Sequence, residues 1–157
     1  MKRKIAILAC VIFFSLEIPF QTHALTFEKL PAVKKSEQWY VKIDNAKITA
    51  PGSIQSKKGV FDTYSVFVKN IGNNVKNTTI EIYRNEPDTK TYYFLFSDNN
   101  TALFNHGTTF THKNLPIDVK AAKVEVVIKW EEKEFNHKKY PEYAGREHKQ
   151  TFVFTEN

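Results

Sequence analysis

Residues 60–84, VFDTYSVFVKNIGNNVKNTTIEIYR, alternate apolar and polar side chains on both sides of an Asn/Gly-rich segment. The alternation indicates two β-strands, because successive side chains of a strand point to opposite faces. Between them, residues 70–74 include Asn and Gly, which tolerate the positive φ of tight turns. We therefore expect a β-hairpin that cannot bury its apolar face alone and needs a larger sheet. The expected inward residues are Val60, Tyr64, Val66 and Val68 on the first strand, and Ile80 and Ile82 on the second.

The rest of the chain repeats this period of two, and no stretch keeps a helical period with caps at both ends. Seven to eight short strands with turn signals between them are typical of an all-β, immunoglobulin-like antiparallel β-sandwich, although a small barrel gives a similar pattern. We favour the sandwich because the strands follow one another as consecutive hairpins. Further strands are expected at residues 39–49, 89–97, 102–104, 107–112, 119–131 and 150–155, with a turn at 98–100 and loops at 114–118 and 132–148.

The first 24 residues have the organisation of a secretory signal peptide. A basic start over residues 2–4 precedes an uncharged apolar run over residues 5–16. Residues 22–24 (THA) then offer small side chains for cleavage after Ala24. The apolar run is shorter than the roughly 20 residues of a transmembrane helix, so we expect no membrane span.

Cys10, the only cysteine of the chain, supports an alternative interpretation of this segment. Residues 7–10 (ILAC) resemble the lipobox of bacterial lipoproteins, in which the cysteine is lipidated. The apolar stretch ahead of it, residues 5–9, is shorter than the roughly 7–15 residues of a signal's apolar region, so we favour simple secretion. Removal of the signal would leave no disulfide, which is typical of a bacterial rather than a eukaryotic exported domain.

Cleavage after Ala24 would leave 133 of the 157 residues. The formal net charge of +6 would fall to +4, because three basic residues and Glu17 leave with the signal. A chain of this length forms one domain that buries about two-thirds of its surface without a covalent staple. We assign residues 25–38 to an N-terminal arm and residues 39–157 to the sandwich. The expected location is secreted and extracellular, and association with the cell wall would extend that prediction.

One segment of the sequence resembles a known group of domains. Residues 64–84 are similar to bacterial immunoglobulin-like modules of the CARDB and FxLYD type, in which an alternating strand ends in Asn and a Gly-containing turn leads to the next strand. The resemblance implies an immunoglobulin-like fold and an accessory, adhesive or binding role outside the cell, without a shared active site. The residues that carry it are Val66, Val68, Asn70, Gly72, Ile80 and Ile82.

The sequence contains no local motif for catalysis or for a cofactor. A Gly-rich phosphate loop, a nucleophile elbow, an HExxH segment and paired cysteines are all absent from it. His106 and His112 on one strand would stand about 20 Å apart at ~3.3 Å per residue, too far to share a metal. His137 and His148 lie near several glutamates but without the spacing of metal ligands. We therefore expect a non-enzymatic protein with no catalytic residue, metal site or cofactor.

Residues 133–149 (KEFNHKKYPEYAGREHK) mix basic and aromatic side chains in a long polar loop. Loops of this length are uncommon in compact domains and are often functional. Cations beside flat aromatic faces suit an anionic polymer or a sugar, so we predict a binding or adhesion module for cell-wall polymer, a glycan or a surface protein. Nucleic acid is not an expected partner, because the net charge is modest. The predicted binding residues are Lys133, Phe135, Lys138, Lys139, Tyr140, Tyr143 and Arg146.

Two other interpretations stay open. Residues 89–97 (TKTYYFLFS) carry apolar side chains on both faces, which indicates a strand covered on both sides or one that meets a partner. The first alternative is therefore a structural or assembly protein that pairs through an exposed edge strand. The second is a secreted enzyme or inhibitor whose site is assembled from distant segments.

Overall fold

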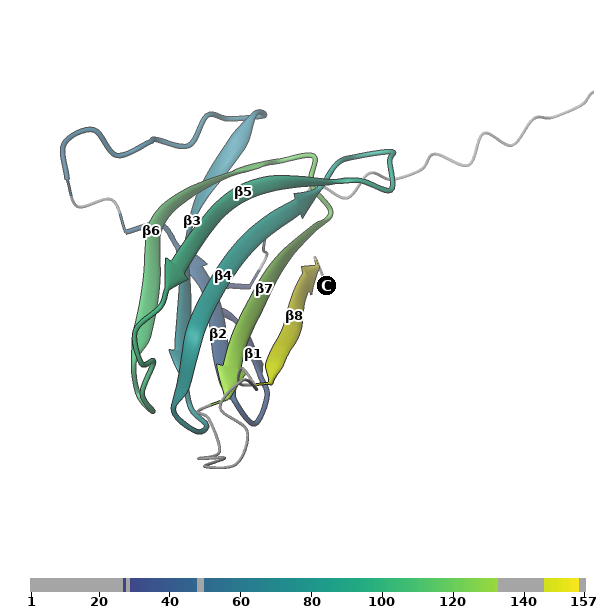
Figure 1. Ribbon diagram of the computed structural model, residues 1–157. Coiled ribbons are helices and arrows are strands. Elements are labelled where there is room, and N and C mark those ends of the chain that lie inside the picture. The colour runs from purple at the N-terminus through teal and green to yellow at the C-terminus, as the bar shows by residue number, and fades with distance from the viewer. Residues whose placement is uncertain (1–26, 28, 48–49, 133–145, 156–157) are drawn as a thin grey trace, which may run out of the picture.

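The computed structural model describes residues 27, 29–47, 50–132 and 146–155, which form two antiparallel four-stranded sheets packed face to face (Figure 1). One sheet has the strand order β1-β2-β3-β6 and the other β5-β4-β7-β8. This arrangement confirms the predicted all-β sandwich. The strands are β1 (Ala32–Lys35), β2 (Trp39–Asn45), β3 (Phe61–Asn70), β4 (Val75–Asn85), β5 (Tyr92–Asn100), β6 (Thr109–Asp118), β7 (Lys123–Glu132) and β8 (Glu147–Thr155). No helix among the described residues is long and apolar enough to cross a membrane.

The predicted hairpin at residues 60–84 is wrong, because β3 and β4 lie in different sheets. β3 pairs with β2 and β6, whereas β4 pairs with β5 and β7. Residues 71–74 therefore carry the chain from one sheet to the other. The period of two identifies the buried face of each strand correctly, but it carries no information about which strand lies alongside.

The core lies between the two sheets and follows the alternation along the strands. Trp39, Val41 and Ile43 of β2 are completely buried, as the sequence predicts. Val60 is the exception, since it precedes β3 and is 46% exposed. The remaining predicted inward positions are buried: Tyr64, Val66, Val68, Ile80, Ile82, Val124, Val126, Ile128, Trp130, Phe152 and Phe154.

Trp39 connects the two sheets through aromatic contacts. Its ring packs edge-on against Trp130 of β7, with centroids 5.5 Å apart, and against Phe104 at 5.7 Å. Phe104 in turn exchanges backbone hydrogen bonds of 2.8 and 3.2 Å with Val75, so the strand predicted at residues 102–104 is a single bridge to β4. Aromatic pairs of this kind add about 0.5–1.5 kcal/mol to the burial of their area.

Several predicted boundaries differ from the structure. The loop expected at residues 114–118 is the second half of β6, and Pro116 fits there because β6 is an edge strand. The turn expected at residues 98–100 belongs to β5, whereas residues 119–122 form a turn rather than the start of a strand. The segment assigned to an N-terminal arm contains β1, which pairs with β2.

The connections between strands gather at two opposite ends of the sandwich (Figure 1). At the loop end lie residues 36–38, 71–74 and 101–108, together with the end of β7 and the start of β8. At the turn end lie residues 50–60, 86–91 and 119–122. Both ends contain a hollow, and the two hollows differ in chemistry.

Two valines near β3 give a matched test of this core. Val66 has no exposed surface, whereas Val60 is 46% exposed. We expect Val66→Ala to lower the free energy of unfolding by about 2 kcal/mol, because it removes buried methyl groups and leaves a cavity. Val60→Ala should change it by less than about 0.5 kcal/mol. Urea unfolding followed by circular dichroism measures both, and equal effects would contradict the assignment.

Candidate functional site

The side-chain amide of Asn70, at the end of β3, organises the loop end. Asn70 is completely buried. Its Oδ1 accepts hydrogen bonds from Gln38 Nε2 at 2.7 Å and from Gly72 N at 3.0 Å. Its Nδ2 donates to the carbonyl oxygens of Asn73 at 2.8 Å and Phe104 at 2.9 Å. All donors and acceptors of the amide are thus used, as a buried polar group requires.

Gln38 and Gly72 complete the crossover between the sheets. The Gln38 carbonyl oxygen accepts hydrogen bonds from Ile71 N at 2.9 Å and Gly72 N at 3.2 Å, and Gln38 Nε2 donates to Asn73 O at 2.8 Å. A Cβ atom on Gly72 would lie 2.9 Å from the Gln38 Cα, so only glycine fits this approach. The crossover is therefore a fixed platform rather than a loose turn.

A cavity of about 700 Å³ opens on this platform. Its walls come from the crossover, from the connection after β5, and from the facing ends of β7 and β8. His106 is anchored to the crossover, since its backbone N–H donates to Asn74 Oδ1 at 2.8 Å and its Nδ1 lies 3.0 Å from the Gly72 carbonyl oxygen. The cavity is lined by Gln38, Gly72, Asn73, Asn74, Val75, His106, Trp130, Glu132 and His148.

One wall of the cavity is a stacked pair from β7 and β8. The His148 imidazole lies parallel to the Trp130 ring, with centroids 5.3 Å apart and an interplanar angle of 14°. His148 Nε2 lies 2.9 Å from Glu132 Oε1, a distance suited to an ion pair when the imidazole is protonated, although the two are not aligned as a hydrogen bond. The wall presents an aromatic surface beside one carboxylate.

Most of the predicted binding residues lie outside the described part of the chain. This applies to Lys133, Phe135, Lys138, Lys139, Tyr140 and Tyr143. Arg146 is described, and it is an exposed residue whose carbonyl oxygen accepts a hydrogen bond of 3.2 Å from Glu132 N. Glu132, which lines the cavity, and Arg146 are therefore neighbours.

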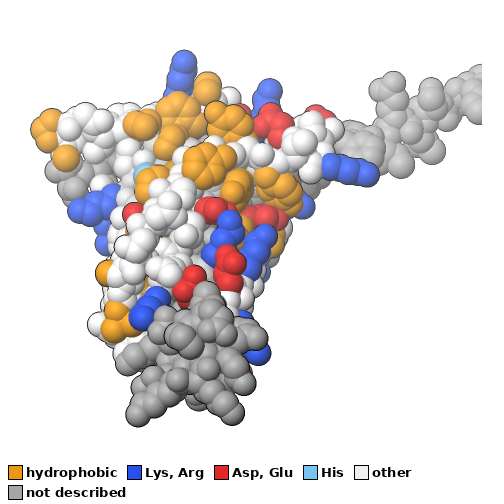
Figure 2. Space-filling model, in the orientation of Figure 1, with side chains coloured by type: hydrophobic (Ala, Val, Ile, Leu, Met, Phe, Trp, Pro, Cys, Tyr) orange, Lys and Arg blue, Asp and Glu red, His pale blue; other side chains and the backbone are white. Residues whose placement is uncertain are grey.

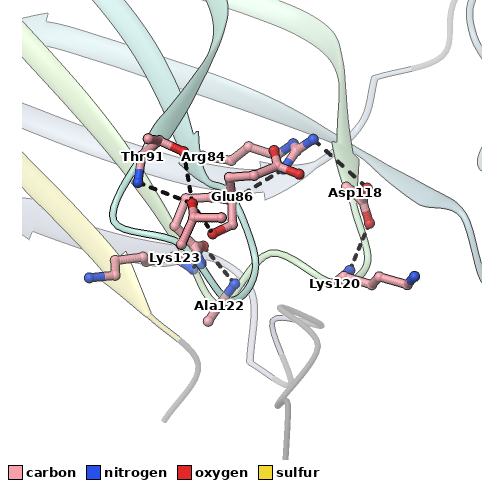
Figure 3. A network of polar contacts seen from close by, with 9 residues as sticks. Arg84, Glu86, Thr91, Asp118, Lys120, Ala122 and Lys123 are labelled. Carbon is pink, nitrogen blue, oxygen red and sulfur yellow. Dashed lines mark hydrogen bonds and ion pairs between the residues drawn. The ribbon is translucent and has the colours of Figure 1, made fainter.

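Arg84 is the centre of a second polar cluster, at the turn end (Figure 3). Its guanidinium contacts Glu86 at 2.8 Å and Asp118 of the other sheet at 3.9 Å. It also lies over the Tyr93 ring, 4.8 Å from the centroid. Arg84 is thus shared between two carboxylates and an aromatic face, and it links the ends of β4 and β6.

A groove of about 390 Å³ lies beside Arg84, between the two sheets. Three consecutive aromatic side chains at the start of β5 are exposed there or next to it: Tyr92 by 42%, Tyr93 by 57% and Phe94 by 52%. Figure 2 shows hydrophobic side chains gathered at this upper end of the molecule. The predicted outward apolar surface of residues 89–97 is therefore present. The groove is lined by Val60, Phe61, Arg84, Tyr93, Phe94, Leu95, Leu115, Pro116 and Asp118.

Among the described residues, the titratable groups with shifted pKa values are not part of the lining of either hollow. Lys129 Nζ donates to Glu81 Oε1 at 2.8 Å, and this bond lowers the pKa of Glu81 and raises the pKa of Lys129. Burial is the main reason that the pKa of Tyr83 is raised. Within the described residues, no three His, Cys, Asp or Glu side chains are grouped so that they could hold a metal ion.

Comparisons with known proteins identify the family of this chain. The sequence profile of the YozF-like secreted proteins matches residues 23–157. The chain belongs to the YozF-like secreted protein family. It is 34% identical over 150 residues to the uncharacterized protein YozF of Bacillus subtilis (strain 168), and the match covers 87% of this chain and 86% of the relative. No solved structure matches it.

Membership of this family confirms the prediction of a secreted protein. The family found is the YozF-like one rather than the CARDB or FxLYD modules that residues 64–84 resemble. Of the residues that shape this YozF-like protein, Asn70 and Gly72 were singled out by that resemblance. Gln38 and Arg84 were missed, because their roles depend on partners that are distant in the sequence.

Replacement of Asn70 should loosen the loop end. Asn70→Ala removes four hydrogen bonds of a completely buried amide, although each partner keeps one other hydrogen bond. We expect the free energy of unfolding to fall by about 3 kcal/mol, because four hydrogen bonds worth about 0.5–1.5 kcal/mol each are lost together. Asn99→Ala is the matched control, since Asn99 is exposed, and it should cost less than about 0.5 kcal/mol. Urea denaturation measures both variants, and a neutral Asn70→Ala would contradict the assigned role.

His112 of β6 should make the stability depend on pH. Its ring packs edge-on against Phe96 of β5 at 4.5 Å, and burial lowers its pKa from 6.5. The unfolded chain then binds a proton at a higher pH than the folded protein, so the stability falls as the pH drops below about 6.5. Urea unfolding at pH 7.5 and 5.0 should show a smaller fall for His112→Gln than for the wild type. An equal fall in both proteins would contradict this.

Proposed function

We propose that this protein is a non-catalytic binding module of the bacterial cell surface that recognises a glycan, or an anionic wall polymer with sugar units, at its loop end. The observation that carries the proposal is the 700 Å³ cavity, in which planar polar side chains surround an aromatic wall. Ligand sites are typically concave, with an apolar surface and a few fixed polar groups.

The chemistry of the cavity suits a polyhydroxylated ring. Amides such as Asn73 and Asn74 both donate and accept hydrogen bonds, as hydroxyl groups do. The His148 ring, stacked on the buried Trp130, supplies a flat face for the C–H side of a sugar. Because Asn70 and Gly72 fix the crossover, the polar groups are held before any ligand arrives, which reduces the entropy lost on binding.

The segment 133–145 adds the positive charge that an anionic polymer would require. The described residues that flank it, Glu132 and Arg146, are joined by a backbone hydrogen bond of 3.2 Å, and Glu132 lines the cavity. Its lysines and tyrosines, with Arg146, are the residues predicted above to bind such a polymer. The proposal thus joins the cavity to the predicted basic and aromatic loop.

A binding role without catalysis fits the arrangement of carboxylates. Glycosidases need two carboxyl groups held ~5–9 Å apart. Glu132 is the only carboxylate among the described residues that line the cavity, and it faces His148. An immunoglobulin-like module would also bind through loops at one end of the sandwich, and the pairing of β3 with β6 and of β4 with β7 is compatible with such a fold.

Retention on purified cell wall tests this function. Lys138, Lys139 and Arg146 replaced together by Glu should weaken retention at least tenfold, and His148→Ala should weaken it by removing the accessible ring of the stacked wall. Cell walls stripped of anionic polymer separate the two ligand classes. His148→Ala should weaken retention on intact and on stripped walls, whereas the charge reversal should weaken retention mainly on intact walls.

The matched control reverses three lysines elsewhere, Lys35, Lys69 and Lys113, all on the β1-β2-β3-β6 sheet. This variant carries the same change of net charge and should be retained nearly as well as the wild type. Equal loss in both triple variants would mean that only net charge matters. Full retention of His148→Ala together with the loop variant would overturn the proposed site.

A further inference from the structure

The turn end exposes more apolar surface than its fold requires. Val60 is 46% exposed, and Tyr92, Tyr93 and Phe94 are between 42 and 57% exposed. These side chains come from two segments, yet Val60, Tyr93 and Phe94 line the same groove. Contiguous exposed apolar surface on a secreted protein indicates contact with a partner or a membrane. We call Val60, Tyr92, Tyr93 and Phe94 the apolar rim.

Lysines surround the apolar rim. Lys57, Lys58, Lys90 and Lys120 are exposed residues of the connections at the turn end, and none has an ion-pair partner within the described part of the chain. Lys123 lies over the Tyr92 ring, 5.8 Å from its centroid. In Figure 2, basic side chains project around the hydrophobic group at this end.

Basic groups outnumber the acidic groups of this end. Arg84 offsets one of the two charges of Glu86 and Asp118, with contacts of 2.8 and 3.9 Å (Figure 3). The second of these charges, together with Asp62 and Asp88, remains against the five lysines. The outer part of the turn end is therefore positively charged around an apolar centre.

We propose that the turn end docks on the surface of an anionic lipid bilayer. The apolar rim would enter the headgroup region, where Tyr and Phe side chains are favoured because they combine apolar rings with interfacial contacts. The lysines would contact anionic headgroups, each contributing roughly fivefold in affinity. This inference does not rest on the proposed glycan site, which lies at the opposite end.

The arrangement favours a bilayer over the other occupants. A soluble polyanion would be held by the lysines and would gain little from exposed Phe94 and Val60. Strand addition to β5 is disfavoured because the register of β4 and β5 shifts between Ile82 and Tyr83, and such irregular edges pair poorly. A lipid surface uses both the charge and the apolar rim at once.

Vesicle sedimentation tests the proposal with the full processed chain. Vesicles of equal parts phosphatidylglycerol and phosphatidylcholine should bind the protein, and pure phosphatidylcholine should bind it at least tenfold more weakly. Tyr93→Ser with Phe94→Ser should reduce binding to the anionic vesicles at least tenfold. The control, Val33→Ser with Leu103→Ser, changes side chains that are 41 and 40% exposed elsewhere and should bind as the wild type does.

A fluorescence measurement reports which end enters the lipid. Tyr93→Trp should be quenched by brominated phosphatidylglycerol, whereas Leu103→Trp, at the loop end, should show no more quenching than the wild type. Unfolding curves establish that each variant is folded.

Three results would overturn the proposal. The first is unchanged binding to anionic vesicles after Tyr93→Ser with Phe94→Ser, which would mean that the protein binds by charge attraction alone. The second is equal quenching of Tyr93→Trp and Leu103→Trp. The third combines two observations: the wild type does not bind vesicles, and light scattering shows that its mass falls to that of a monomer in the variant with Tyr93→Ser and Phe94→Ser. This would mean that a second copy covers the apolar rim.

Discussion

A single buried amide holds the chain at the point where it leaves one sheet for the other. Asn70 closes β3, and its four side-chain hydrogen bonds reach the β1–β2 turn, the crossover and the connection after β5. These segments are far apart in sequence, and the other bonds between them are a few backbone hydrogen bonds, such as those between Phe104 and Val75, and the hydrogen bond from the Gln38 side chain to Asn73 O. Without this amide, four further hydrogen bonds worth about 0.5–1.5 kcal/mol each would be lost.

The aromatic contacts of Trp39, beneath this amide, also join the two sheets. Trp39 meets Trp130 and Phe104 directly below the crossover, so the sheets are joined by packing where they are joined by the chain. The floor of the cavity is thus rigid for two independent reasons, hydrogen bonding and aromatic packing. Rigid support of this kind is what a binding surface needs if its polar groups are to keep their directions.

The sequence predicts the buried face of almost every strand, because alternation is a local property that survives in any sheet order. It does not predict the pairing of β3 with β6 or of β4 with β7, because these depend on segments that are distant along the chain. Val60 shows that the alternation can also mispredict burial. Its apolar side chain fits the pattern, but it precedes β3 and is exposed.

The candidate sites also contain features that the sequence predicts and features that it does not. Asn70 and Gly72 have the residue types of a tight turn, so the sequence predicts a change of direction there but not a crossover between sheets. The partnership of Arg84 with Asp118, and that of His148 with Trp130, arises only when strands come together. Pro116 predicts a loop because proline cannot donate a ladder hydrogen bond, but β6 is an edge strand, where proline is tolerated.

The length of the strands has a consequence for how the molecule changes over evolution. Strands of ten residues, such as β6 and β7, separate the crossover end from the Arg84 end by about 33 Å at ~3.3 Å per residue. Substitutions that far apart have nearly additive effects on stability. Each end can therefore acquire new side chains without destabilising the other, and the strands between them keep the two ends at a constant distance.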